Sequence, residues 1–131
     1  MKLLIPTIGT KLELTKKWSF DLYFEDRNSS VMSYFGVNRD DPKYRPIYSY
    51  PKKHISVSFP KGTILIVDRI YIRCGGKDMK EYDSVTFRVI LPDGTTNFKT
   101  RENWGNKLKN VRLRFWAKLP DVNNIYCKEV E

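Results

Sequence analysis

The chain has 131 residues, and its 24 lysines and arginines exceed its 15 aspartates and glutamates, which gives a formal net charge of +9. This length fits a single domain over residues 1–131, and a hydrophobic content of 40% excludes an intrinsically disordered chain. The two cysteines, Cys74 and Cys127, are too few for a disulfide framework and match no zinc-binding spacing. We expect two reduced thiols, since nothing in the sequence argues for a bridge between them.

The N-terminal sequence Met-Lys-Leu-Leu-Ile-Pro has three apolar residues before Pro6. That is far short of the apolar core of about 7–15 residues in a signal peptide. No run approaches the roughly 18 apolar residues of a membrane helix. We therefore expect a cytoplasmic protein without a membrane partner.

Alternating apolar and polar residues predict strands in the first part of the chain. Residues 11–25 indicate one or two strands, split near Lys16, with Trp18, Phe20 and Leu22 on a shared face. Residues 26–30 are typical of a turn, and residues 31–37 fit either a short strand or a helical turn.

Residues 38–53 are rich in proline and tyrosine, with prolines at positions 42, 46 and 51. Proline lacks the backbone donor that a helix interior or a central strand needs. This segment is therefore predicted to be a long surface loop within the single domain.

The longest predicted strand covers residues 63–73, after a strand at 54–59 and a turn at Pro60-Lys61-Gly62. Side chains of a strand alternate between its two faces. We expect Ile64, Ile66, Ile70 and Ile72 to face the core and Arg69, Tyr71 and Arg73 to face outward. Asp68 stands alone among the isoleucines, so it needs a partner if it is buried.

The second half of the chain continues the strand pattern. Residues 82–91 predict a strand with Val85, Phe87 and Val89 inward. Pro92-Asp93-Gly94 is a turn signal, and residues 95–100 are predicted to pair back as a hairpin. No segment has a sustained helical period. We therefore predict an all-β, mainly antiparallel fold, a small SH3-like or OB-like barrel or sandwich with at most short helices.

The last predicted strand, 110–119, divides hydrophobic from basic residues and ends before Pro120. Leu113, Phe115 and Ala117 point one way, whereas Arg114, Trp116 and Lys118 point the other. Residues 99–118 hold seven cations against one anion. If this strand lies in one sheet with 63–73 and 82–91, the outer faces form a basic, aromatic patch. The candidate binding residues are Arg69, Tyr71, Arg73, Arg88, Lys99, Arg101, Arg112, Arg114, Trp116 and Lys118.

Arginines that neutralise phosphates beside rings that stack on bases are typical of nucleic-acid-binding surfaces. The leading hypothesis is a non-enzymatic nucleic-acid-binding β-barrel, with DNA or RNA as partner. The alternative is a protein-interaction module or inhibitor that binds an acidic protein, because tyrosine, tryptophan and arginine are enriched at interface hot spots. A solvated sheet face without a partner also explains the charge. In general texture the chain is similar to small accessory proteins of bacteriophages and mobile elements, a likeness that covers no motif and transfers no residue.

Catalytic and cofactor signatures are few. His54 is the single histidine, and Cys74-Gly75-Gly76-Lys77 lacks the spacing of a phosphate-binding loop. We expect no catalytic residue, no resident metal and no cofactor. The less favoured enzymatic reading is a metal-dependent nuclease that uses Asp68, Glu81 and Asp83, since carboxylates near a basic surface can hold Mg²⁺.

Overall fold

The structure, a computed structural model, describes residues 7–37, 54–72, 83–101 and 108–131, without the side chains of residues 26, 100, 101 and 108. Within these ranges the chain is mostly strand, and every paired strand is antiparallel to its neighbour. The predicted all-β, mainly antiparallel class is therefore confirmed. The predicted loop at 38–53 lies outside the described residues.

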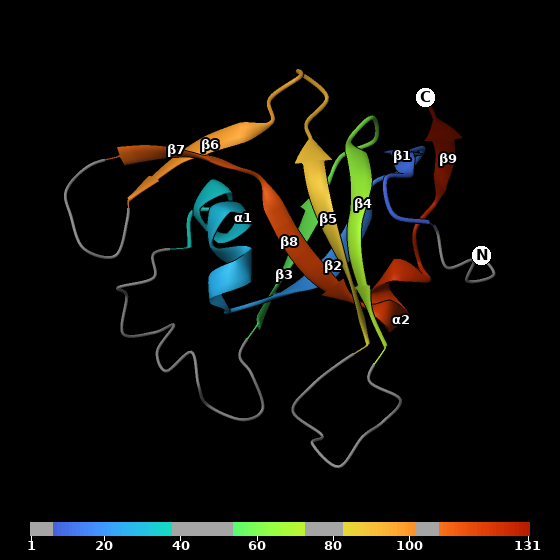
Figure 1. Cartoon of the computed structure of the whole chain (residues 1–131), viewed down its shortest axis with the longest axis horizontal. Coiled ribbons are helices and arrows are strands. Elements are labelled where there is room, and N and C mark those ends of the chain that lie inside the picture. Colours follow the sequence, from blue (N-terminus) through green and yellow to red (C-terminus); the bar gives the residue numbers. More distant parts are fainter. Residues whose placement is uncertain (1–6, 38–53, 73–82, 102–107) are drawn as a thin grey trace, which may run out of the picture.

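The strands form one large sheet and two pairs (Figure 1). The large sheet has the order β8-β5-β4-β1-β9, and the pairs are β2-β3 and β6-β7. In chain order, the elements are β1 (Lys11–Leu14), β2 (Trp18–Tyr23), the 3-10 turn η1 (Asp26–Asn28), α1 (Ser29–Tyr34), β3 (His54–Phe59), β4 (Ile64–Tyr71), β5 (Ser84–Ile90), β6 (Asn97–Arg101), β7 (Leu108–Arg112), β8 (Arg114–Lys118), α2 (Leu119–Val122) and β9 (Cys127–Val130).

An aromatic core joins the β2-β3 pair to the inner face of the large sheet. Phe20 of β2 stacks on Phe115 of β8 with ring centroids 4.9 Å apart, and Phe59 of β3 lies 5.6 Å from the same ring. Trp18 meets Phe87 of β5 edge-on at 6.2 Å. Stacked and edge-on aromatic pairs contribute beyond their buried area. These contacts therefore fix the β2-β3 pair across the large sheet.

The strand pairings among the described residues do not close into a ring, so the barrel or sandwich and its SH3-like or OB-like form are not confirmed. β8 and β9 are the two outermost strands of the large sheet. The β6-β7 pair extends away from this sheet above α1, as Figure 1 shows. Phe98 of β6 packs edge-on against Tyr34 of α1 at 5.7 Å, which anchors the pair to the helix.

The strands whose apolar and polar residues alternate strictly form in the structure as the sequence predicts. The segment 11–25 divides into β1 and β2, as expected for a break near Lys16. β3 occupies the predicted range 54–59. Val85, Phe87 and Val89 of β5 are all buried in the core, as predicted. In the segment 31–37, for which a strand and a helical turn were both open, residues 31–34 form the end of α1 and residues 35–37 follow it.

The predicted hairpin between 82–91 and 95–100 is wrong. The turn after β5 does form, because Gly94 N–H donates to the Leu91 carbonyl (2.8 Å) and Leu91 N–H donates to the Thr95 carbonyl (2.9 Å). β5, however, already has β4 on one side and β8 on the other. The chain therefore leaves the large sheet, and β6 pairs with β7.

The C-terminal third also differs from the prediction. The expected strand 110–119 divides at Leu113, whose N–H donates to Thr96 and whose carbonyl accepts from Val89. β7 therefore belongs to the β6-β7 pair and β8 to the large sheet. β8 ends at Lys118, and Pro120 lies in the first turn of α2. β9 was not predicted from the sequence.

A β-bulge in β4 reverses the expected orientation of its first half. The pairing with β5 shifts register between Val67 and Arg69, so Asp68 is an extra residue. Leu65 and Val67, both 0% exposed, face the core in place of Ile64 and Ile66. Beyond the bulge Ile70 packs against the core as predicted, whereas Ile72 is 48% exposed. A bulge inserts one residue and so exchanges the two faces of the strand.

Side chains from the η1-α1 segment take the place of a neighbouring strand along β8. Asn28, fully buried, accepts a hydrogen bond from Trp116 N–H on Oδ1 (2.8 Å) and donates from Nδ2 to the Tyr23 carbonyl (2.9 Å). Ser30 Oγ accepts from Arg114 N–H (3.0 Å) and donates to the Arg114 carbonyl (3.2 Å). These bonds hold the segment beside the large sheet.

We predict that Asn28→Ala lowers the free energy of unfolding by about 2 kcal/mol, because it removes two buried hydrogen bonds to the backbone. Chemical denaturation measures this loss, and amide exchange should accelerate at Trp116. The control is Asn124→Ala, which truncates an exposed asparagine and should change stability by less than about 0.5 kcal/mol. Equal effects of the two substitutions would contradict the role of Asn28.

Candidate functional site

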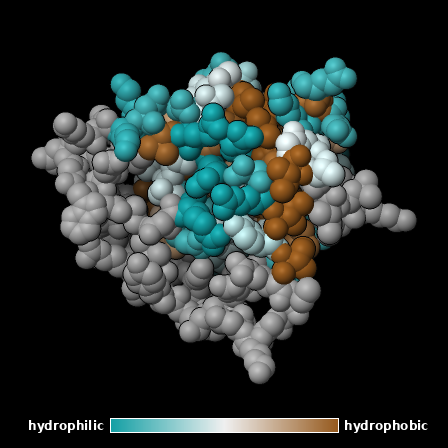
Figure 2. All heavy atoms as spheres, in the orientation of Figure 1, coloured by the Kyte–Doolittle hydropathy of each residue, from teal (hydrophilic) through white to brown (hydrophobic). Residues whose placement is uncertain are grey.

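The structure brings three strands with predicted site residues into one sheet, with their polar side chains on a shared outer face. Arg88 of β5 lies directly opposite Arg114 of β8. Thr86 lies between Arg69 of β4 and Trp116 of β8, and Ser84 lies between Tyr71 and Lys118. In Figure 2 a hydrophilic area occupies the middle of this face, beside a hydrophobic strip over β4.

A pocket of about 260 Å³ opens where this face meets the η1-α1 segment and the end of β7. Among the described residues, four arginines and one aspartate line it, and together they carry a formal charge of +3. The lining residues are Arg27, Ser29, Ser30, Asp68, Arg88, Val111, Arg112 and Arg114. These residues come from six different elements, and the folded arrangement alone brings them together.

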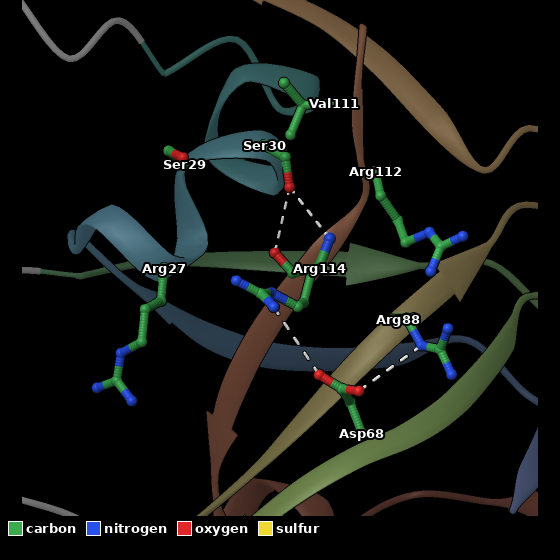
Figure 3. Close-up of a pocket in the computed structure, with 8 residues that line it drawn as sticks. All are labelled: Arg27, Ser29, Ser30, Asp68, Arg88, Val111, Arg112 and Arg114. Carbon is green, nitrogen blue, oxygen red and sulfur yellow. Dashed lines mark hydrogen bonds and ion pairs between the residues drawn. The ribbon is translucent and has the colours of Figure 1, made fainter. Parts of the chain in front are cut away.

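Asp68 lies between two arginines that face each other across adjacent strands (Figure 3). Its carboxylate is 3.8 Å from Arg88 Nε and 3.9 Å from Arg114 Nη1. Like charges directly opposite in a sheet are destabilising. The bulge places the single carboxylate of the pocket where it offsets this repulsion. Both distances exceed hydrogen-bonding range, so the carboxylate leaves the donors of both guanidinium groups unused.

Arg88 and Arg112 have side chains that a ligand can reach. The side chain of Arg88 is 35% exposed, although its Nε is buried and makes no hydrogen bond to a described residue. Arg112 is exposed, and its side chain forms no ion pair or hydrogen bond within the described parts of the chain. Figure 3 shows its guanidinium group on the same side of Asp68 as that of Arg88. The exposed parts of these two arginines are therefore the donors that a bound anion would meet.

Arg27 is a pocket residue that the sequence analysis missed. It forms an ion pair with Glu25 and lies 5.8 Å from the ring centres of both Tyr71 and Trp116. Figure 3 shows it at the rim, turned away from Asp68. Its segment has only a turn signal in the sequence, and no periodicity relates it to strands that follow later in the chain.

The prediction that Trp116 is an exposed stacking ring is wrong. The side chain does lie on the outer face, but only 3% of the residue is exposed. Tyr23 stacks on it with ring centroids 5.1 Å apart and an interplanar angle of 9°, and Arg27 lies over the same ring. Because Trp116 is covered by parts of its own chain, it offers no platform to a nucleic-acid base.

Lys118 is engaged within the fold. Its Nζ donates to Asp21 Oδ2 at 2.9 Å and lies 5.7 Å from the Tyr23 ring centre. The hydrogen bond to Asp21 raises the pKa of Lys118 above the ordinary lysine value, against the opposing effect of burial. A raised folded-state pKa means that this stabilisation is present at neutral pH and is lost only as the pH rises above the ordinary lysine range. The positive charge of Lys118 is therefore already balanced by the carboxylate of Asp21.

The remaining predicted residues divide into three groups. Arg69 is exposed on the outer face and donates to the Tyr71 hydroxyl at 3.3 Å, which raises the pKa of Arg69. Lys99 is exposed on β6, on the same side of the β6-β7 pair as Arg112 by register. Arg73 and the side chain of Arg101 lie outside the described residues.

The described residues contain no group of three or more histidines, cysteines or carboxylates that would hold a metal ion. The expected nuclease set falls partly outside them, because Glu81 is not described. Asp68 faces two arginines, an environment that suits an anion better than a cation. His54 lies 3.8 Å from Asp21 and packs against the Tyr23 ring. Burial raises the pKa of the free Cys127 thiol, which makes it less reactive.

Comparisons with protein-family models, curated protein sequences and solved structures return no match. Among the described residues, no helix has the length and apolar character needed to cross a membrane. The interpretation of the site therefore depends on its own geometry and charge.

We predict that Asp68→Asn lowers the free energy of unfolding by about 1 kcal/mol at low ionic strength, because Arg88 and Arg114 then repel each other without compensation. Added salt should reduce the loss by screening. Glu129→Gln is the control, since it removes an exposed carboxylate from the same sheet. Chemical denaturation at low and high ionic strength measures both variants. A loss at Asp68 that does not depend on salt would contradict the electrostatic explanation.

Proposed function

We propose that the protein binds nucleic acid through its phosphate groups, without catalysis, and that the arginine pocket on the outer sheet face is the principal contact. The observation that carries this proposal is that Arg88, Arg112 and Arg114 line one pocket, in which Arg88 and Arg114 flank the carboxylate of Asp68. Arginine binds phosphate oxygens through a planar fork of donors.

The charge of the whole chain supports an anionic partner. A net charge of +9 attracts nucleic acid at long range, and the pocket supplies donors at short range. The burial of Trp116 argues against base stacking at that position. We therefore infer recognition of the backbone rather than of sequence, for which affinity falls steeply with added salt.

Arginine substitution tests this proposal. Arg112→Ala should weaken binding to labelled DNA or RNA by about tenfold and reduce the slope of log affinity against log salt by about one. Its side chain has no partner among the described residues, so the fold should be unaffected. The measurement is fluorescence anisotropy over a salt series, with single and double strands of both nucleic acids.

Two controls separate the pocket from general charge attraction. Lys61→Ala removes one exposed positive charge outside the pocket and should weaken binding by less than about threefold. Asp68→Asn removes the negative charge from the pocket and should tighten binding, although it destabilises the fold. The proposal fails if the wild type binds no nucleic acid at low salt, or if Arg112→Ala and Lys61→Ala have equal effects.

The same measurement also tests the alternative hypothesis that the partner is an acidic protein. Polyglutamate with the same number of charges as the oligonucleotide serves as the competitor. Phosphate-directed binding predicts that polyglutamate competes weakly against a duplex, because a duplex carries one charge per roughly 1.7 Å and an extended polyglutamate about one per 3.5 Å, so the duplex releases more condensed counterions on binding. Equal competition would favour the protein-interaction alternative over nucleic acid.

A further inference from the structure

The geometry points to a ligand with more charge and more acceptor oxygens than an internal phosphodiester. We propose that the arginine pocket receives a terminal phosphoryl group, a phosphate monoester at the end of a nucleic-acid strand or on a free nucleotide. For the strand-end source, this inference rests on the proposed function.

The first argument is size. The pocket volume of about 260 Å³ lies below the range of roughly 300–1,000 Å³ that is typical of pockets for drug-sized ligands. A single phosphoryl group with part of its sugar suits this space better than a base and sugar together. The pocket is bounded by the η1-α1 segment, by β4 and β5, and by the junction of β7 and β8.

The second argument is charge. A phosphate monoester carries about −1.5 to −2 charges at neutral pH and three strong acceptor oxygens, whereas a phosphodiester carries a single charge. The three arginines around Asp68 leave an excess of two positive charges when Arg27 at the rim is set aside. This excess matches a monoester and exceeds what one phosphodiester neutralises.

The third argument is the direction of the donors. Arg88 approaches from β5, Arg112 from the end of β7 and Arg114 from β8, so three guanidinium groups come from three strands (Figure 3). A terminal phosphoryl group presents its oxygens on several sides and needs one exit for the rest of the molecule. Arg88 Nε is buried, so the exposed part of this side chain, which is 35% accessible, is what a ligand can reach.

Asp68 limits affinity while it orders the site. Its carboxylate holds two arginines 3.8 Å and 3.9 Å away, but it also repels an incoming anion. Attraction to the arginines and repulsion by the carboxylate both increase with the charge of the ligand, so Asp68 lowers the net attraction for every phosphate. Asp68→Asn should therefore tighten binding of all phosphates and increase the preference for monoesters, which carry the larger charge.

Matched oligonucleotides test the inference by titration calorimetry. One carries phosphates at both ends, a second of the same sequence carries hydroxyls, and a third with hydroxyl ends is longer by four nucleotides. The third controls for the added charge. We expect the phosphorylated strand to bind the wild type about tenfold more tightly than either hydroxyl-ended strand. Arg112→Ala should abolish this preference, and Lys61→Ala should retain it.

A nucleoside monophosphate, its unphosphorylated nucleoside and inorganic phosphate identify the source of the ligand. If the monophosphate alone binds in an Arg112-dependent way and neither hydroxyl-ended nor phosphorylated strands bind, the pocket is a free-nucleotide site and the proposed nucleic-acid function is wrong. Equal, salt-dependent binding of all three strands would overturn the terminal-phosphate inference and leave the proposed function standing. No binding of any phosphate would overturn both.

Discussion

The β-bulge at Asp68 is the constraint on which both the core and the candidate site depend. β4 lies inside the large sheet, with β1 on one side and β5 on the other, so it has no freedom to rotate its faces. Leu65, Val67 and Ile70 all reach the core only because one extra residue is inserted between Val67 and Arg69. That same residue brings a carboxylate to the paired arginines of β5 and β8.

The outer face of the large sheet has two parts, which use their side chains differently. Next to the pocket, the aromatic rings are used within the fold, because Tyr23, Trp116 and Arg27 stack in sequence and Lys118 binds Asp21. Cation–π contacts of this kind stabilise structure as well as ligands. Among the described residues, Arg88, Arg112 and Arg114 of the pocket have no such aromatic partner, which shifts the site from the aromatic residues of the predicted patch to its cations.

Local alternation was sufficient to predict much of the sheet, because β2, β3 and β5 each have one clearly apolar face. It failed for β4, where Ile64, Leu65, Ile66 and Val67 are all apolar and either face could be buried. The hairpin error had a tertiary cause, since the turn signal after β5 was correct but both neighbouring positions were occupied. Arg88, Arg112 and Arg114 were candidates from the sequence. The contribution of Arg27 and the pairing of Asp68 depend on contacts between distant segments that no local pattern encodes.

The side chains of Asn28 and Ser30, which bind the backbone of β8, also affect contacts between copies of the protein. A strand from a second molecule that approached β8 would find the backbone groups of Arg114 and the amide of Trp116 already bonded. Exposed sheet edges are the usual route by which β proteins join into extended sheets. These groups of β8 are therefore not available to extend the large sheet into a second copy of the chain on the side where the arginine pocket lies.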